Sequence, residues 1–364
     1  MRALITGIGG FVGGHLATLL RQEGFEVWGI DRLPVSADVA NCAVAIELGD
    51  VCDPAFTSRV AQNARPTHVF HLAWEFGDRD RVGNADTADR NVLGLTVLLE
   101  SIGTSARDAR ILIASSSAVY GDSGRQPIDE DASLTPTNAS RASKLAVEAA
   151  AASYRGAHDR QPIDEEAPLK PTTSYGASKL AVETAAASFR SAHGMNIVAT
   201  RTFNLLGPGM PPRLFAGSMA AQIAAAERGG SPTIMVGRLD SSRDYVDVRD
   251  AVRAYLALAS LPTVDVCDAA RASLAPAGQS ARAPWVFNVC SGVSRSCQEI
   301  ADEMLALARV PVALDHDVAR LQTGDIDRQQ GSAVRLGRAT GWTPTIAFST
   351  SVRDTLDHAR RHRA

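Results

Sequence analysis

Residues 3–20 read Ala-Leu-Ile-Thr-Gly-Ile-Gly-Gly-Phe-Val-Gly-Gly-His-Leu-Ala-Thr-Leu-Leu, and this stretch decides the fold. A short apolar run leads into glycines at positions 7, 10 and 13, and leucines at helical spacing follow. Glycines at these places let the backbone turn tightly and approach a pyrophosphate, and the next helix offers its N-terminal N–H groups to that anion. A strand, glycine turn and helix in this order predict a dinucleotide-binding unit.

Further apolar runs alternate with helical patterns along the first part of the chain. With the opening run, they lie at residues 3–6, 26–30, 45–51, 67–73 and 110–114. The alternation predicts an α/β fold: a doubly wound parallel sheet of the Rossmann type, with a smaller α/β substrate-binding domain at the C-terminal side. We expect residues 1–204 to form the dinucleotide-binding domain and residues 205–364 mainly the substrate-binding domain. Segments near 244–262 and 285–290 are expected to return to the first domain.

Composition excludes several classes of function. The chain has 364 residues, 45% of them hydrophobic, and a net charge of −3, so neither nucleic acid nor a membrane is expected as a partner. No apolar run approaches the roughly 20 residues of a membrane span. The five cysteines lack C-x-x-C spacing, so no metal site is predicted. The first residues run directly into a strand pattern rather than a signal peptide, and we expect a cytoplasmic protein.

The end of the second apolar run indicates the cofactor. Asp31 stands 18 residues beyond Gly13, where an acid can accept hydrogen bonds from both adenosine ribose hydroxyls and repel a 2′-phosphate. This favours NAD. Arg32 could instead pair with that phosphate, so NADP is the alternative. Asp50, at the end of the third run, is expected near the adenine amino group; its alternative role is a turn or helix-capping acid.

Tyr175-Gly176-Ala177-Ser178-Lys179 carries the candidate chemistry. At a spacing of four, the tyrosine and the lysine project from one helix face. A nearby ammonium group favours the phenolate, which makes Tyr175 a candidate general acid and base. Taken alone, the pattern also fits an exposed pair on an ordinary helix.

The stretch around Tyr175 occurs twice. Residues 125–159 reappear as residues 160–194, with 24 identities in 35 aligned positions. In the first copy Ser140 replaces the tyrosine, whereas Lys144 matches the lysine. We therefore expect Tyr175 and Lys179 to line the cofactor pocket and Ser140 and Lys144 to lie outside it. The first copy is expected to be an insertion that forms its own helix, about residues 141–158, on the outer surface.

Several motifs together resemble the extended short-chain dehydrogenases/reductases of the sugar-nucleotide epimerase/dehydratase family. They are T-G-x-x-G-F-x-G (6–13), H-L-A (71–73), S-S-S-A-V-Y-G (115–121), Y-G-A-S-K (175–179) and R-x-F-N-x-x-G-P-G (201–209). Further segments, 232–249, 287–292 and 340–344, are most similar to GDP-4-keto-6-deoxy-mannose reductases. The resemblance implies an NAD(P)-dependent oxidoreductase acting at a ring carbon, C4, of a nucleotide-diphosphate sugar. An NAD-dependent 4-epimerase and a non-catalytic dinucleotide sensor are the alternatives.

The resemblance also implies roles for individual residues. Ser116 would hydrogen-bond the sugar oxygen that undergoes redox, Tyr175 would exchange its proton, and Lys179 would hold the nicotinamide ribose and lower the pKa of Tyr175. Dehydratases of the family carry an acidic pair after that serine, whereas this chain has Ser117 and Ala118, which disfavours dehydration. Cofactor contacts are implied for Gly7, Gly10, Phe11, Val12, Gly13, Asp31, Arg32, Asp50, Val51, Leu72, Ala73, Asn91, Tyr175 and Lys179.

On the substrate side, Asn204 and Arg243 match family positions that contact the nucleotide diphosphate. The family usually has a second diphosphate-binding arginine where this chain has Gln322. Arg320 or Arg328 could replace it; otherwise diphosphate binding is weaker or the substrate is not a typical sugar nucleotide, because glutamine lacks the bidentate fork of arginine. In related enzymes the tyrosine–lysine helix helps to form a two-fold interface. A homodimer is therefore expected, with an interface that the duplicated helix could remodel.

Overall fold

The computed structural model describes residues 1–76, 85–121, 163–165, 169, 171, 173–261, 285–317 and 327–362. Its elements in chain order are β1 (Arg2–Thr6), α1 (Phe11–Gln22), β2 (Glu26–Asp31), α2 (Ala37–Ala40), β3 (Ala45–Leu48), α3 (Pro54–Ala64), β4 (His68–His71), α4 (Ala85–Ser105), β5 (Arg110–Ser116), η1 (Ser117–Val119), α6 (Ser174–His193), β6 (Ile197–Thr202), β7 (Asn204–Leu206), α7 (Phe215–Ala226), β8 (Thr233–Val236), β9 (Ser242–Asp247), α8 (Val248–Ser260), β10 (Val286–Val289), β11 (Ser294–Ser296), α10 (Cys297–Ala306), β12 (Ala313–His316), β13 (Arg328–Gln329), α11 (Val334–Thr340) and α12 (Phe348–Arg361).

A seven-stranded sheet forms the larger part of the molecule. Its strand order is β10-β6-β5-β4-β1-β2-β3, and every neighbouring pair is parallel. This confirms the predicted doubly wound sheet. After β3 the chain crosses to the other side of β1, so the order reverses between β1 and β4. Loops leaving the carboxyl ends of these two strands diverge, and the crevice between them is where open α/β sheets bind ligands.

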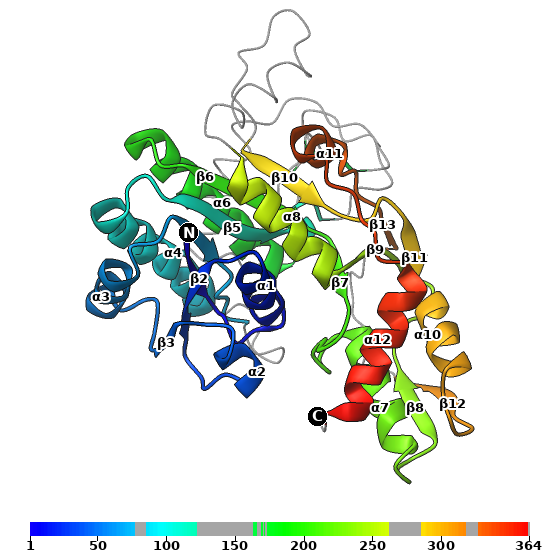
Figure 1. Ribbon diagram of the computed structural model, residues 1–364. Helices are drawn as coiled ribbons and strands as arrows, with labels where there is room; N and C mark the ends of the chain where they lie inside the picture. The colour runs from blue at the N-terminus through cyan, green and yellow to red at the C-terminus, as the bar shows by residue number, and fades with distance from the viewer. Residues whose placement is uncertain are drawn as a thin grey trace, which may run out of the picture.

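Helices cover both faces of this sheet (Figure 1). On one face α1 packs against α8, and α8 packs against α11; on the other, α4 packs against α3 and α6. Strand residues alternate between the two layers: Ala3 and Ile5 of β1 belong to the first apolar cluster, and Leu4 belongs to the second. Because a sheet covered on both sides has no solvated face, its strands are apolar at successive positions.

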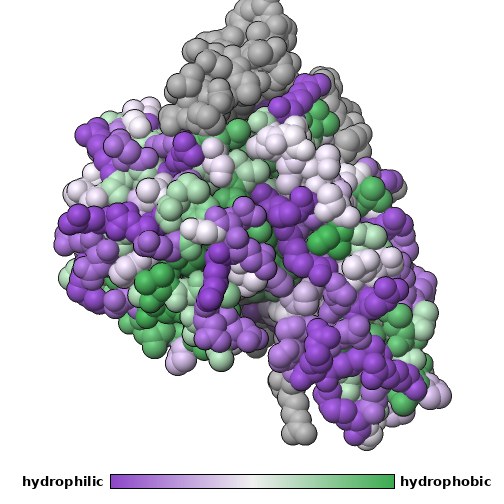
Figure 2. Space-filling model, viewed as in Figure 1, coloured by the Kyte–Doolittle hydropathy of each residue, from purple (hydrophilic) through white to green (hydrophobic). Residues whose placement is uncertain are grey.

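The smaller part of the chain lies at the lower right of Figure 1 and contains α7, α10 and α12. These helices share an apolar cluster with the strand pair β8–β12. A second small sheet joins β9 to β7, β11 and β13. Of the segments expected to return to the first domain, β10 joins the seven-stranded sheet, whereas β9 belongs to the small sheet. The domain division at residue 204 stays a prediction. On the face in Figure 2, the surface over the smaller part is mostly hydrophilic, and a notch separates it from the larger part.

The second copy of the repeated stretch is built into the fold. Helix α6 begins after Thr173, whose hydroxyl accepts from Gly176 N, and ends at Gly194, which has a φ of 64°. Ahead of this helix, Ile163 N donates to Gln330 O at 2.7 Å. The first copy, including Ser140, Lys144 and the helix expected at 141–158, lies outside the described residues. No helix in the described parts of the chain has the length and apolarity to cross a membrane.

Candidate active site

The glycine turn after β1 is too tightly packed for side chains. A Cβ on Gly13 would lie 2.2 Å from Gly7 O, and one on Gly7 would lie 2.8 Å from Ala73 Cα. Gly7 has a φ of 73°, and its N–H donates to Ile30 O at 2.8 Å. Gly10 precedes α1 and supplies no side-chain cap, so the turn presents backbone N–H groups at a helix N-terminus. These residues fit the diphosphate of a dinucleotide cofactor.

Asp31 ties the end of β2 to this turn. Its Oδ2 accepts from Gly9 N at 2.8 Å, and its Oδ1 accepts from Leu33 N at 3.2 Å. Arg32, the predicted alternative partner of a 2′-phosphate, pairs with Glu75, with 3.0 Å between Arg32 Nη1 and Glu75 Oε2. The two residues that bear on NAD or NADP selection are thus both engaged within the protein.

Asp50 lies at the carboxyl end of β3 and pairs with Arg90, with 2.5 Å between Arg90 Nη2 and Asp50 Oδ2. Its other oxygen accepts from Cys52 N at 2.9 Å, which is the turn role considered for it. Burial is the largest influence on the pKa of Asp50 and acts to raise it, but the hydrogen bonds from Cys52 and Arg90 together lower it.

Other predicted cofactor residues surround the crevice. Phe11 and Val12 open α1, next to the glycine turn. Leu72 N donates to Thr6 O, and Ala73 N to Thr6 Oγ1, which keeps the segment after β4 beside β1. The side chains of Val51 and Asn91, also predicted to contact the cofactor, are instead engaged within the protein. Val51 packs partly buried against the second apolar cluster, and Asn91 uses its amide to hold the backbone of Glu75, through bonds of 2.9 and 3.0 Å.

The three predicted catalytic residues come together at the carboxyl end of β5. Ser116 is its last residue, and its hydroxyl accepts from Ala118 N at 3.2 Å. Tyr175 lies in the first turn of α6, close enough to Ser116 for the serine side chain to act on the pKa of the phenol. One turn later, Lys179 donates to Ala114 O, with 2.7 Å between Nζ and the carbonyl oxygen. Ser116 and Tyr175 therefore lie close together in space, although 59 positions separate them in the sequence.

Acid–base properties correct one expectation. Burial raises the pKa of Tyr175 to about 12, although the Ser116 side chain acts in the opposite direction. The sequence had suggested that Lys179 brings the pKa of this phenol toward neutrality, and in the structure it does not. Its ammonium lies 5.8 Å from the Tyr175 ring centre, against 3.4 Å for Trp74, and burial lowers its own pKa to about 7. At neutral pH Tyr175 is a protonated donor.

Three further side chains surround Tyr175 and were not predicted. The Trp74 ring meets it edge to face at 5.7 Å, and the Phe76 ring stacks on it at 5.9 Å. The Arg213 guanidinium covers Phe76 at 4.3 Å. Trp74 directly follows the H-L-A motif, so the sequence could have predicted that it lies at the site. Arg213 has no such signal, because only the fold brings the segment before α7 to this place.

A buried polar network fixes α6 against β5 and β6. Arg201 Nη2 lies 2.7 Å from Glu183 Oε2, and Ser115 Oγ donates to the other carboxylate oxygen at 2.5 Å. Tyr120 accepts from Arg201 Nη1 at 3.2 Å and donates to Asn288 Oδ1 at 2.8 Å. Since buried polar groups are costly when unpaired, this set of partners favours one placement of the helix that carries Tyr175.

The predicted substrate residues are spread over the smaller part. Asn204 lies opposite Tyr245 in the β7–β9 pair, two positions along from Arg243. Arg243 faces Arg295 across the β9–β11 pair. Arg320 lies outside the described residues, as does Gln322. The structure therefore describes two of the three predicted substrate residues, and it places them on adjoining strands.

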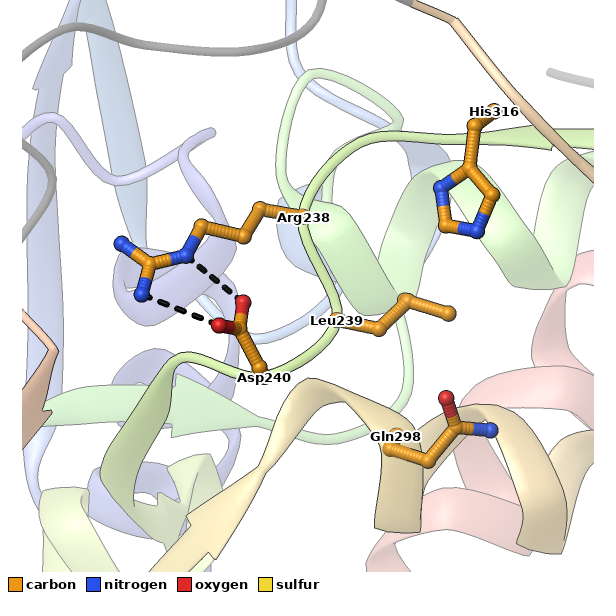
Figure 3. A pocket seen from close by; sticks show the side chains of 5 residues that line it. All are labelled: Arg238, Leu239, Asp240, Gln298 and His316. Carbon is orange, nitrogen blue, oxygen red and sulfur yellow. Dashed lines mark hydrogen bonds and ion pairs between the residues drawn. The ribbon is translucent and has the colours of Figure 1, made fainter.

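A separate hollow opens on the smaller part (Figure 3). Its lining consists of Arg238, Leu239, Asp240, Gln298 and His316. The Arg238 guanidinium forms ion pairs with two carboxylates, those of Asp240 and Asp327, each at 2.6 Å. None of the predicted site residues lines this hollow. Within the described ranges, no group of His, Cys, Asp and Glu side chains could hold a metal ion.

Sequence comparisons agree with this geometry. Residues 3–163 match the NAD dependent epimerase/dehydratase family, and residues 156–355 match the GDP-mannose 4,6 dehydratase family. The chain belongs to the extended short-chain dehydrogenases/reductases. This confirms the resemblance seen in the motifs. Its relatives include NAD(P)-dependent sugar-nucleotide reductases and epimerases.

Two curated relatives of this short-chain dehydrogenase/reductase span nearly all of it. GDP-6-deoxy-D-mannose reductase of Pseudomonas aeruginosa is 29% identical and aligns with 98% of this chain and 96% of its own length. UDP-glucose 4-epimerase of Mycolicibacterium smegmatis is 25% identical, with 99% of both chains covered.

Solved structures show the same fold. RMD from Pseudomonas aeruginosa, complexed with NADPH, has a TM-score of 0.73 at 26% identity and covers 99% of both chains. A putative epimerase from Burkholderia cenocepacia has a TM-score of 0.73 at 28% identity, covering 99% of this chain and 98% of that one.

Proposed function

We propose that this protein is an NAD(P)-dependent oxidoreductase that acts at C4 of a nucleotide-diphosphate sugar, as in the reduction of a 4-keto-6-deoxy-sugar nucleotide. The observation that carries the proposal is the convergence of Ser116, Tyr175 and Lys179 beside the glycine turn. The full-length similarity to a GDP-6-deoxy-D-mannose reductase supports reduction as the direction. A homodimer and a cytoplasmic location stay predictions.

Each of the three residues has a role that its environment supports. When bound, the nicotinamide supplies a hydride to the keto carbon. Ser116 would donate a hydrogen bond to the keto oxygen and so orient it toward Tyr175. Because its pKa is about 12, Tyr175 holds its proton at neutral pH and would give it to the oxygen that becomes a hydroxyl. The Lys179 ammonium, now on Ala114 O, would also reach the nicotinamide ribose.

Dehydration is disfavoured by the residues after Ser116. Ser117 is buried and donates to Gln329 Oε1 at 3.0 Å, and Ala118 has no polar side chain. Neither position offers a carboxyl group for removing a proton next to the keto group. Although a GDP-mannose 4,6 dehydratase family matches residues 156–355, these two side chains favour redox chemistry alone.

Epimerisation is the second candidate, favoured by the full-length similarity to a UDP-glucose 4-epimerase. An epimerase returns its hydride to the same sugar and retains oxidised cofactor, whereas a reductase consumes reduced cofactor. The test is incubation with NADH or NADPH and a GDP-4-keto-6-deoxy-hexose. We expect a stoichiometric loss of reduced-nicotinamide absorbance, at a rate that Tyr175→Phe lowers sharply. A parallel incubation with NAD and UDP-glucose tests the alternative: inversion at C4 without net cofactor consumption, together with no reduction of the keto sugar, would establish the epimerase and refute the reductase.

A further inference from the structure

Four charged side chains, linked by ion pairs, lie along the adenosine side of the expected cofactor crevice. Arg32 Nη1 and Arg90 Nε both contact Glu75 Oε2, at 3.0 and 2.9 Å. Arg90 also contacts Asp50 Oδ2. We call Arg32, Glu75, Arg90 and Asp50 the cofactor-edge network. Its side chains keep between 32% and 52% of their surface exposed, so a bound molecule can reach them.

The network spans three strand ends. Arg32 follows β2, Asp50 follows β3, and Glu75 comes from the segment after β4. Because β1 lies between β4 and β2 in the sheet, the contact of Glu75 with Arg32 joins segments on either side of β1. Asn91 holds the Glu75 backbone on both sides, because its amide accepts from Glu75 N and donates to Glu75 O. The carboxylate is therefore placed by a fixed backbone rather than by a free loop.

Charge makes this edge a poor partner for an additional phosphate. With Asp31, the network holds three carboxylates and two guanidinium groups, which gives a net charge of −1 for these five residues. A phosphate monoester adds about −1.5 to −2. Arginine forks suit phosphate well. Here, however, Arg32 and Arg90 both contact the same carboxylate oxygen of Glu75.

We infer that Glu75 is a determinant of cofactor choice. Its carboxylate keeps Arg32 and Arg90 from turning to a 2′-phosphate, and it adds a negative charge where that phosphate would lie. Glu75 thereby acts together with Asp31 to select NAD(H). The inference rests on the proposed function only in taking the cofactor to be a nicotinamide dinucleotide.

Binding of two adenosine fragments tests the inference without any turnover. Calorimetry would compare 5′-AMP with adenosine 2′,5′-bisphosphate on the full chain. Wild type should bind 5′-AMP more tightly. Glu75→Gln keeps the size of the side chain and the bonds between Asn91 and the backbone of residue 75, but it removes the negative charge that holds Arg32 and Arg90. It should tighten bisphosphate binding roughly five- to tenfold, while 5′-AMP binding changes by less than about twofold, as expected for partly exposed charges.

Two comparison variants make the result specific. Glu47 pairs with Arg59 at 3.2 Å and is as exposed as Glu75, so Glu47→Gln changes the net charge equally without releasing Arg32. It should leave both affinities unchanged. Adding Arg32→Ala to Glu75→Gln should remove most of the gain, because the gain acts through the freed guanidinium.

Failure of the inference and failure of the proposed function look different. If 5′-AMP binds and Glu75→Gln leaves the bisphosphate affinity unchanged, or if wild type already prefers the bisphosphate, only the role of Glu75 is refuted. If Glu75→Gln and Glu47→Gln give equal gains, the effect is one of total charge, and the role is likewise refuted. If neither fragment binds to wild type, the dinucleotide cofactor itself is refuted.

Discussion

Glu183 of α6 and Arg201 of β6 form a buried ion pair, with 2.7 Å between Arg201 Nη2 and Glu183 Oε2. Glu183 belongs to the second copy of the repeated stretch, and the first copy has Glu148 at the matching position. Either copy thus offers the acid that Arg201 requires. This interior contact cannot by itself decide which copy forms the helix, whereas Tyr175 can, since the first copy lacks a tyrosine there.

Deleting residues 125–159 should leave a folded, active enzyme. The remaining copy carries Tyr175, Lys179 and Glu183, and the spacing from Ser116 to the tyrosine shortens from 59 to 24 residues. We expect cofactor binding and turnover within about threefold of wild type, because the remaining copy supplies the site residues Tyr175 and Lys179. Calorimetry and a turnover assay would check this. An unfolded or inactive product would show that the first copy is required.

Deleting residues 160–194 instead is the matched control. That chain should fold, since Glu148 and the apolar positions match, but it should be inactive because Ser140 stands at the tyrosine position. Introducing Ser140→Tyr with Arg141→Gly should then restore turnover. Full activity in the shortened chain before these substitutions would contradict the assignment of Tyr175 as the proton donor.

Tyr175→Phe should lower turnover by about 10²–10⁴-fold, the usual contribution of a positioned general acid. The ring contacts with Trp74 and Phe76 remain, so the melting temperature should change little. The control is Tyr120→Phe, which removes a buried hydroxyl that bonds Asn288 and Arg201. It should cost about 1–3 kcal/mol of stability. Equal activity losses in the two variants would argue against a specific role for Tyr175.

Asp31→Asn should weaken NAD(H) binding about tenfold, since a charged acceptor is replaced by a neutral one. The same change should improve NADP(H) relative to NAD(H). KM values for the two reduced cofactors would measure the shift. Asp53→Asn, at the N-cap of α3, is a suitable control because its carboxylate bonds only to Ala55 N and Phe56 N among the contacts described. A wild-type preference for NADP(H) would contradict this role of Asp31.

Acid should destabilise the fold through His71. Burial, reinforced by the charge of Lys179, lowers the pKa of this histidine to about 3, from 6.5. Between these values the unfolded chain binds a proton that the folded chain does not, so the free energy of unfolding falls as the pH falls. The loss should reach about 2 kcal/mol at pH 5. Urea unfolding at pH 7 and pH 5 would measure it.

His71→Gln is the comparison for that measurement. Glutamine can still bond Thr6 Oγ1, the 2.8 Å partner of His71 Nδ1, but it does not titrate. Its stability should therefore depend less on pH between 7 and 5, whatever its absolute value. An unchanged slope would assign the acid sensitivity to other groups, among them His68, whose pKa is lowered to about 4 by burial.

The sequence by itself determined the fold class and the chemical groups of the site. Gly7 is needed for its φ of 73°, and Gly13 is needed because a Cβ there would lie 2.2 Å from Gly7 O; both requirements arise within the turn itself. Tyr175 and Lys179 share a helix face through spacing alone. The strand that ends at Ser116 was readable from its apolar run. In each case the physical cause lies within a few consecutive residues.

Only the tertiary structure decided how these groups behave. The ammonium of Lys179 lies on Trp74 and on Ala114 O, contacts that no spacing encodes, and burial keeps Tyr175 protonated where the sequence suggested easy ionisation. Arg32 meets Glu75 across 43 residues of sequence. Solvation and pairing depend on segments that meet only when the sheet assembles, and electrostatic free energies follow from those encounters rather than from composition.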